Sequence, residues 1–301
     1  MAYGSPESLD DVEAYFTHIL GGHAPSPEAV DALRARYRQI GGRSPLLEIT
    51  RRQAAGVEAL LQERGVSVRV YVGMKHAPPF IAETVAQMAD DGIRHAAGVA
   101  LAPHYSKMSI GGYVSAVTSA SEAHGIEMRC VEHYHDHPRL VQALADRIEI
   151  VRRDFPTHRD VPVVFTAHSL PERILEWEDP YPDQLTRTCE LVASAASIDR
   201  WQFAFQSASH TAEPWLGPDV LVALRDLREA GARQVIVAPI GFVADHLEVL
   251  YDIDVEARRT AERLGMRLER APSLNDGLDF LSVLADVAGG TLASFQVRER
   301  V

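Results

Sequence analysis

The stretch that decides the fold is Val161-Pro-Val-Val-Phe-Thr-Ala-His-Ser-Leu-Pro171. Its apolar, β-branched residues predict a buried strand, and the small residues that follow predict a turn carrying His168. Val235-Ile-Val-Ala-Pro-Ile-Gly-Phe-Val-Ala-Asp-His-Leu-Glu248 repeats this plan, because an apolar strand again runs into a polar helix start. In open α/β sheets the ligand lies outside the carboxyl ends of the strands. A histidine and a carboxylate delivered there can bind a metal ion or move protons.

Length and composition limit the kinds of protein to consider. A chain of 301 residues with 46% apolar residues is expected to form one large or two medium domains. Its net charge of −12 argues against nucleic acid and anionic membranes as partners, since both attract basic surfaces.

Cysteine usage and hydropathy indicate where the protein works. Cys130 and Cys189 are too few for a four-cysteine iron–sulfur or zinc site, and they indicate a reduced cytoplasmic setting. The N-terminus shows no basic-then-apolar signal pattern, and the longest uninterrupted apolar stretch, near 235–244, is short for a membrane span. We therefore expect a cytoplasmic location without membrane insertion.

Strand and helix patterns alternate along the chain, which is typical of βαβ units and parallel sheets. Strands are expected at 68–74, 96–102, 126–132, 161–166, 201–206 and 235–239. Helices are expected at 79–91, 112–124, 139–154, 183–196, 219–230, 244–264 and 278–288.

A weak internal repeat predicts two similar domains. In residues 89–104 and again in 228–240, a helix pattern stops at a glycine, an arginine follows two residues later, and a strand ends in Ala-Pro. Gly92 and Gly231 are the expected left-handed caps of those helices. We assign residues 1–137 and 275–301 to one α/β domain and residues 138–274 to the other.

Several polar side chains follow predicted strands, as His168 does. A histidine at a strand end is commonly a core-edge residue bonded to backbone, but the Ala-His-Ser-Leu-Pro setting favours function. The other such positions are Tyr3, Lys75, His76, His104, Gln206 and the Asp245–Glu248 loop. Their convergence at strand ends indicates a site more strongly than any one motif.

Two interpretations of the carboxylates at 245–256 stay open. Asp245, Glu248, Asp252 and Glu256 fall at helical spacing on one face, which is typical of a solvated acidic surface or of a path for cations. Apolar neighbours on both sides predict that Glu248 is partly buried and functional.

Other motifs carry less weight. His133-Tyr-His-Asp-His137 could offer alternate histidines to a divalent ion, but the adjacent Pro138 and polar surroundings favour a solvated loop. The sequence contains no Gly-x-Gly-x-x-Gly, P-loop or Gly-x-Ser-x-Gly motif, which argues against dehydrogenase, kinase and serine-hydrolase functions.

Nearly end to end, the chain resembles the ferrochelatases. The matching segments are 37–46, 71–76, 165–171, 179–185, 206–207, 214–218 and 241–252. The Met-Ala-Tyr-Gly opening and the Met-Lys-His segment at 74–76 look like the soluble bacterial branch that acts on coproporphyrin. The resemblance implies two Rossmann-like domains of the chelatase type, with parallel sheets facing a central cleft. It implies insertion of Fe²⁺ into a porphyrin in haem biosynthesis, with release of two protons.

The resemblance also implies roles for particular residues. His168 is the implied base or early metal ligand, and Glu248 works with it on the same side of the macrocycle. Tyr3 is implied to approach the metal from the opposite face. Asp252 and Glu256 match an outer site for a divalent cation.

The chain departs from the family pattern at three places. Relatives carry several apolar residues before the equivalent of Tyr3, so a short first strand and a loosely held Tyr3 are expected. The loop 19–23 lacks the arginines of soluble relatives, which leaves the substrate to Tyr3, Arg43, Ser44, Gln53, Lys75, His76 and Lys107. There is no cysteine cluster or long C-terminal tail, so we expect a monomer without an iron–sulfur cluster.

Alternative functions remain at this stage. They are a ferrochelatase for protoporphyrin IX, a cobalt chelatase for a reduced tetrapyrrole, and a non-catalytic haem-binding protein. Measuring metal insertion into each tetrapyrrole distinguishes the enzymes from one another, whereas a haem carrier would bind haem without inserting metal. A downstream acceptor of the haem product is a further expected partner.

Overall fold

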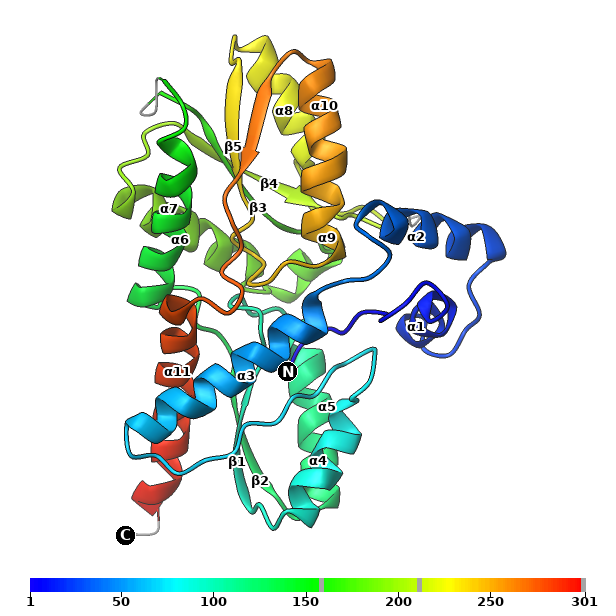
Figure 1. Cartoon of the computed structure of the whole chain (residues 1–301), viewed down its shortest axis with the longest axis vertical. Helices are drawn as coiled ribbons and strands as arrows, with labels where there is room; N and C mark the ends of the chain where they lie inside the picture. The colour runs from blue at the N-terminus through cyan, green and yellow to red at the C-terminus, as the bar shows by residue number, and fades with distance from the viewer. Residues whose placement is uncertain (157–159, 210–212, 299–301) are drawn as a thin grey trace. The chain divides into compact units, whose positions relative to one another are not determined.

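The computed structural model describes residues 1–156, 160–209 and 213–298 (Figure 1). The chain divides into two compact units. Unit 1 comprises Met1–Tyr134 with Asn275–Val301, and unit 2 comprises His135–Leu274.

Unit 1 combines helices with a short parallel sheet. β1 (His95–Val99) pairs with β2 (Glu127–Val131). The helices are α1 (Val12–Ile19), α2 (Pro27–Gln39), α3 (Leu46–Glu63), α4 (Ile81–Asp90), α5 (Ile110–Ala123) and α11 (Leu278–Arg298). The first three had no predicted counterpart. α2 still shows a local start signal, because Ser26 accepts a hydrogen bond from the Ala29 N–H and Pro27 occupies the first turn.

The expected strand at 68–74 is wrong as a ladder-forming strand. Within the described residues its only strand-type pairing is at Met74, which bridges Ala2 and Phe80. The Val70 N–H instead donates to the Glu58 carboxylate at 2.6 Å. The segment is apolar enough for a strand, but along 68–72 no neighbouring strand supplies backbone partners.

α11 packs against α3, β1 and β2 in unit 1, and it is longer than the predicted 278–288. Gly56 permits the close approach to α3, because a Cβ there would lie 2.5 Å from the Leu281 Cδ1. Among the described residues, α11 is the one helix with the length and composition to cross a membrane, and 33% of its window Leu278–Phe295 is buried. Core helices of soluble proteins pass the same test, so the absence of membrane insertion stays a prediction.

Unit 2 is built on four parallel strands in the order β4-β3-β5-β6. They are β3 (Val163–His168), β4 (Trp201–Gln206), β5 (Gln234–Ala238) and β6 (Arg267–Arg270). Val163, Val164 and Phe165 in β3 are fully buried, as expected for a parallel strand covered on both faces. β6 escaped prediction because Leu268 is its one apolar residue.

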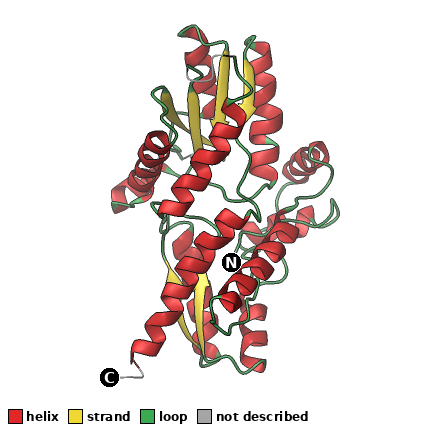
Figure 2. Cartoon of the chain, turned by 60° about the vertical axis from the view of Figure 1, so that its left-hand side comes forward, coloured by secondary structure: helices red, strands yellow, loops and turns green. Residues whose placement is uncertain are grey.

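Helices cover both faces of this sheet (Figure 2). α6 (Pro138–Arg152) and α7 (Tyr181–Ala195) pack together. α8 (Val220–Glu229) and α10 (Arg258–Arg263) belong to a core cluster that includes Val164, Val235 and Val237. A 3-10 helix, η1, spans Glu172–Trp177. The α/β class with parallel sheets is thus confirmed.

The helix predicted at 244–264 is present from Leu247 to Arg263, but it is not a regular α-helix throughout. The structure has a short α9 (Leu247–Leu250), a π-helix η2 (Asp252–Ala257) and then α10. The Glu256 N–H donates to the Tyr251 carbonyl five residues earlier, at 2.9 Å. A π-turn adds one residue to the helical repeat and is frequent at functional sites. It changes which side chains share a face.

The repeated helix–glycine–strand joint is present in both units. Gly92 follows α4 with φ 81°, and Gly231 follows α8 with φ 93°. Equivalent backbone bonds close both helices, from the Ile93 N–H to Met88 O and from the Ala232 N–H to Leu227 O. The predicted left-handed glycine caps are confirmed.

Candidate functional site

Three polar residues of unit 2 meet at the carboxyl ends of its strands. His168 is the last residue of β3 and pairs in register with Gln206, the last residue of β4. The Gln206 amide donates to the Glu248 carbonyl at 2.7 Å, which holds the start of α9 beside these strand ends. Gly241 allows the β5 loop to come close, because a Cβ there would lie 2.5 Å from the Ala167 Cβ. The local fold thus brings His168 and Glu248 together.

The carboxylate of Glu248 lies between two imidazoles. Its Oε1 is 3.6 Å from His168 Nε2, and its Oε2 is 3.5 Å from His246 Nε2. In both rings Nδ1 faces a backbone carbonyl, that of Ser169 for His168 and that of Ala244 for His246. A carbonyl only accepts, so each Nδ1 carries the hydrogen. Nε2 is therefore the atom at which each ring gains or loses a proton.

Charge coupling dominates the titration of this cluster. Burial by itself lowers the pKa of His168, but the nearby negative charge of Glu248 outweighs it and raises the pKa to about 9. Burial opposes and Glu248 favours the charged form of His246, whose pKa is also raised. In return, both imidazoles hold the pKa of Glu248 well below its usual range despite burial. These shifts all favour the ion-paired form of the cluster, an imidazolium beside a carboxylate.

The predicted acidic stripe is not a uniform face. Asp245 accepts a hydrogen bond from Ser273 at 2.7 Å and lies 3.3 Å from the Arg270 guanidinium, so it is part of an ion-paired structural contact. Asp252 is only 4% exposed and accepts a hydrogen bond from Ser207. Glu256 is exposed. The π-helix separates their environments, leaving Asp252 as the buried charge beside the histidines.

Aromatic side chains surround His168. The Trp215 and Phe242 rings lie 6.4 and 6.5 Å from its ring centroid. The Tyr181 hydroxyl donates to the His168 carbonyl at 2.9 Å, which anchors the backbone where β3 ends. These contacts hold the histidine among aromatic side chains.

In unit 1, Tyr3 belongs to a different cluster. Its side chain is 40% exposed, and its ring centroid lies 4.6 Å from that of His76. Contrary to the expectation of loose attachment, its backbone is held by the His76 N–H, which donates to Tyr3 O at 2.8 Å. His76 Nδ1 lies 3.1 Å from His18 Nδ1. Burial, and then the Lys75 and His18 charges, lower the pKa of His76 to about 4.

The remaining candidates for substrate contact differ in burial. Arg43 and Lys107 are exposed cations. Lys75 Nζ lies 5.3 Å from the Tyr113 ring centroid, and burial lowers its pKa. Ser44 and Gln53 are buried, and each bonds to backbone: Ser44 accepts from the Leu46 N–H, and the Gln53 amide donates to Asn275 O at 2.7 Å. These two contacts are structural.

Three further histidines differ from what the sequence analysis indicated or were not singled out by it. His104 is 2% exposed. His135, in the expected solvated loop, is instead buried, and Thr188 donates to its carbonyl at 3.0 Å. His246 was missed as a site residue, although it lies in the quoted Asp-His-Leu-Glu segment. Its spacing of two residues from Glu248 was the signal that the sequence offered.

The fold of the chain is that of the metal chelatases. A solved structure described as SirB from Bacillus subtilis with Fe³⁺ matches with a TM-score of 0.58 at 13% identity, covering 81% of this chain and 92% of that one. A second, the sirohydrochlorin chelatase SirB in complex with cobalt, matches with a TM-score of 0.55 at 12% identity, covering 81% and 89%.

The chain belongs to the ferrochelatase family, whose model, described as Ferrochelatase, matches residues 1–291. It is 44% identical over 295 residues to the ferrochelatase of Herpetosiphon aurantiacus, covering 96% of this chain and 97% of that protein. It is 42% identical over 293 residues to the coproporphyrin III ferrochelatase of Geobacillus kaustophilus, covering 95% and 93%. The coproporphyrin III ferrochelatase of Bacillus subtilis is 41% identical over 293 residues, covering 95% and 94%.

Proposed function

We propose that this protein inserts Fe²⁺ into coproporphyrin III to give coproheme in haem biosynthesis, as a lyase that forms nitrogen–metal bonds. Family membership supports the reaction class, and the names of the Geobacillus and Bacillus relatives support the substrate. The observation that carries the proposal is the Glu248 carboxylate between the Nε2 atoms of His168 and His246.

Metal insertion needs groups that accept protons, and this cluster offers them. A porphyrin that accepts Fe²⁺ must lose two pyrrole protons, and pyrrole N–H groups are very weak acids. Nε2 of His168 is the proposed acceptor or first metal ligand, and Glu248 stabilises the imidazolium that forms. His246 offers a second Nε2 on the same carboxylate and can pass a proton onward.

The raised pKa of His168 bears on whether metal contact or proton transfer comes first. The raised pKa favours a protonated His168 in the metal-free site, so the ring has to lose that proton before it can act as a base. Arrival of a dication beside Glu248 favours loss of that proton, because metal ligands must be deprotonated. We therefore place Fe²⁺ contact with Glu248 before transfer of pyrrole protons, so that the deprotonated Nε2 of His168 is available to accept one of them.

Other residues have supporting roles in the proposal. Tyr3 is assigned to contact with the metal, and Lys75 and His76 beside it to contact with the porphyrin. Arg43 and Lys107 are the exposed cations proposed for propionate recognition, whereas Ser44 and Gln53 contribute through the structure of unit 1. Asp252 and Glu256 are assigned to an outer divalent-cation site. The enzyme is proposed to act as a cytoplasmic monomer, without an iron–sulfur cluster, and to deliver its product to a downstream acceptor.

An anaerobic insertion assay tests the proposal. Purified protein is given Fe²⁺ with coproporphyrin III or protoporphyrin IX, and the loss of free-porphyrin fluorescence is followed. Faster insertion into coproporphyrin III is expected. A preference for protoporphyrin IX would assign the other branch of the family, and insertion only of Co²⁺ into a reduced tetrapyrrole would assign a different chelatase. Haem binding without any insertion would identify a carrier.

A further inference from the structure

Two histidine side chains of unit 1 face each other through the same ring atom. Nδ1 of His18 lies 3.1 Å from Nδ1 of His76, and the two ring planes are nearly perpendicular, at 79°. The rings come from positions 58 residues apart, since His18 lies in the last turn of α1 and His76 lies in the loop before α4. The proposed insertion chemistry makes no use of this contact.

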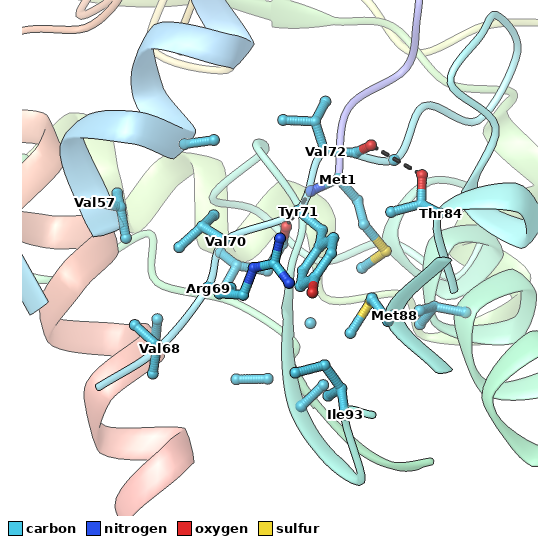
Figure 3. A pocket seen from close by; sticks show the side chains of 18 of the residues that line it. Met1, Val57, Val68, Arg69, Val70, Tyr71, Val72, Thr84, Met88 and Ile93 are labelled. Atoms are coloured by element: carbon cyan, nitrogen blue, oxygen red, sulfur yellow. Dashed lines mark hydrogen bonds between the residues drawn. The ribbon is translucent and has the colours of Figure 1, made fainter. Parts of the chain in front are cut away.

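The backbone that carries His76 is fixed by contacts within its own surroundings. The preceding segment 68–72 runs along an apolar cavity of about 270 Å³ inside unit 1, and the Thr84 hydroxyl donates to Val72 O at 2.9 Å (Figure 3). The His76 N–H donates to Tyr3 O at 2.8 Å, and the Tyr3 ring packs beside the imidazole, with centroids 4.6 Å apart. These contacts hold His76 without help from α1.

His18 is held by a different contact. Its ring stacks on that of Phe80, with centroids 4.9 Å apart and an angle of 22° between the planes. Phe80 is itself fixed at the start of α4, where its N–H donates to the Glu83 carboxylate at 3.2 Å. The side chain of His18 is exposed, and its contact with His76 lies at the surface. Two separately anchored rings therefore present one nitrogen each to the same point at the surface.

The distance between the two nitrogens limits their protonation. Two Nδ1–H groups facing each other at 3.1 Å would place two hydrogens in the same space, so at least one Nδ1 carries a lone pair. A pair of neutral rings is then joined by one N–H···N hydrogen bond. To bind a metal through both Nδ1 atoms, one ring has only to move its hydrogen from Nδ1 to Nε2. Metal binding to the neutral pair therefore involves a tautomer change and no net loss of a proton.

The spacing of the nitrogens suits a metal ion held by two imidazoles. With metal–nitrogen bonds of about 2.0–2.1 Å, two ligand nitrogens are about 2.8–3.0 Å apart at a right angle and about 3.3–3.4 Å apart at the tetrahedral angle. The 3.1 Å between the His18 and His76 nitrogens falls between these values. Imidazole is a ligand of zinc, copper, iron and nickel, whereas magnesium and calcium prefer oxygen ligands. The pair is therefore matched to a transition-metal ion.

The cation next to His76 in the chain is held on another element. The Lys75 ammonium lies against α5, with Nζ 5.3 Å from the Tyr113 ring centroid, in a favourable cation–π contact. Gly112 gives it room, because a Cβ there would lie 2.6 Å from Nζ. The Lys75 charge therefore weakens the binding of a metal ion at the histidine pair without blocking the two nitrogens.

We propose that His18 and His76 form a binding site for a divalent transition-metal ion, held by the two Nδ1 atoms while water fills its other coordination positions. Both rings are anchored by contacts that a metal leaves intact, so little conformational freedom is lost on binding. The site leaves Nε2 of His76, with its hydrogen, for the porphyrin contact proposed above. The inference does not rest on the proposed function, because metal and protein alone are enough to test it.

The first experiment adds Zn²⁺ to the full chain without porphyrin and follows the ring nitrogens of its histidines by NMR. Nδ1 of His18 and Nδ1 of His76 should shift together, at the same Zn²⁺ concentration and as a single binding event. The rings of His168 and His246 report separately on the cluster of unit 2. Shifts confined to those two rings, or to only one member of the His18–His76 pair, would overturn the proposal.

The second experiment removes one ligand at a time and measures Zn²⁺ affinity from the ring that remains. His18→Gln should raise the Kd reported by His76 at least about tenfold, and His76→Gln should do the same at His18, because one imidazole alone cannot chelate. His23→Gln, which removes an exposed histidine from the adjoining loop, is the matched control and should leave the Kd unchanged. An unchanged Kd in His18→Gln and His76→Gln would show that the two rings do not share an ion. The first experiment decides the matter even if a variant fails to fold.

Discussion

At the residue scale, the candidate site depends on a single carboxylate shared by two imidazoles. Glu248 is located by its own backbone, since Gln206 bonds to its carbonyl. The rings are located through their Nδ1 atoms and the carbonyls of Ser169 and Ala244. The backbone contact of each Nδ1 therefore orients the Nε2 atom of the same ring toward Glu248, without help from another side chain. Substituting the carboxylate tests the chemistry without removing those contacts.

Glu248→Gln is expected to leave porphyrin binding intact and to lower the insertion rate by several hundredfold, because the negative charge that stabilises His168 as an imidazolium is lost. Steady-state insertion and porphyrin fluorescence titration measure the two quantities. Glu190→Gln, on the exposed face of α7, is the matched control. His168→Ala combined with Glu248→Gln should be no worse than the worse single variant, since residues that act as a unit are non-additive. Multiplied losses would show two independent roles.

The same pair predicts a pH dependence of stability. His168 has a folded pKa of about 9 against 6.5 for the ordinary side chain. The folded state therefore binds the proton more tightly, and the resulting stability is complete below pH 6.5 and lost as pH rises through 9. The loss is up to about 3 kcal/mol. Urea unfolding at pH 6.5 and 9.5 should show a smaller decrease for His168→Gln than for the unsubstituted chain. Equal decreases would mean that other groups control this pH range.

At the element scale, sequence patterns located most elements but not their irregularities. β4 has the predicted bounds, and both glycine caps follow from local chemistry. The π-helix could not be predicted, because 244–264 has the spacing of an ordinary helix, and the burial of Ile253 and Ala257 in the unit 2 core depends on contacts far along the chain. For the same reason the acidic stripe was wrong, since its spacing assumed a regular helix. The extended segment 68–72 has its hydrogen-bond partners elsewhere in the chain, so its own sequence could not show whether it joins a sheet.

The π-helix carries the proposed outer cation site. Asp252→Asn combined with Glu256→Gln should raise the Fe²⁺ concentration needed for half-maximal insertion by about tenfold, which corresponds to ~1.4 kcal/mol of cation binding. The KM for porphyrin should change little, because neither side chain is proposed to contact the ring. Glu262→Gln, an exposed carboxylate on α10, is the control. Equal increases for metal and porphyrin would identify a structural role instead.

At the scale of the whole molecule, two α/β units were expected from a weak repeat, and the chain divides at Tyr134 and Asn275. The site residues predicted from strand ends fall into both units. His168 and Glu248 could be expected to lie close together from the sequence, because His168 ends β3 and Glu248 follows β5, the neighbouring strand of the same sheet. The bonding of Ser44 and Gln53 to backbone could not, because it depends on turns and on contacts between residues more than two hundred positions apart.

The N-terminal ammonium predicts a second pH effect, of opposite sign. Burial lowers its pKa from 8.0 to about 6. The unfolded chain then binds the proton more tightly, so the free energy of unfolding should fall by ~2 kcal/mol as pH is lowered from 8 to 6. An Nα-acetylated chain should lose this component. Urea unfolding of both forms at pH 6 and 8.5 gives the difference, and parallel pH profiles would contradict the burial of the ammonium.

The π-helix has a consequence for how this protein can change over generations. Its additional residue can be removed only by a deletion within Asp252–Ala257, and no substitution can imitate that step. A deletion would restore the regular helical repeat while rotating the residues on one side by about 100° relative to those on the other. Asp252 could not then keep both its bond to Ser207 and the alignment of α10 with the sheet. Point mutation can thus tune each side chain of the cluster, whereas the length of this segment is fixed.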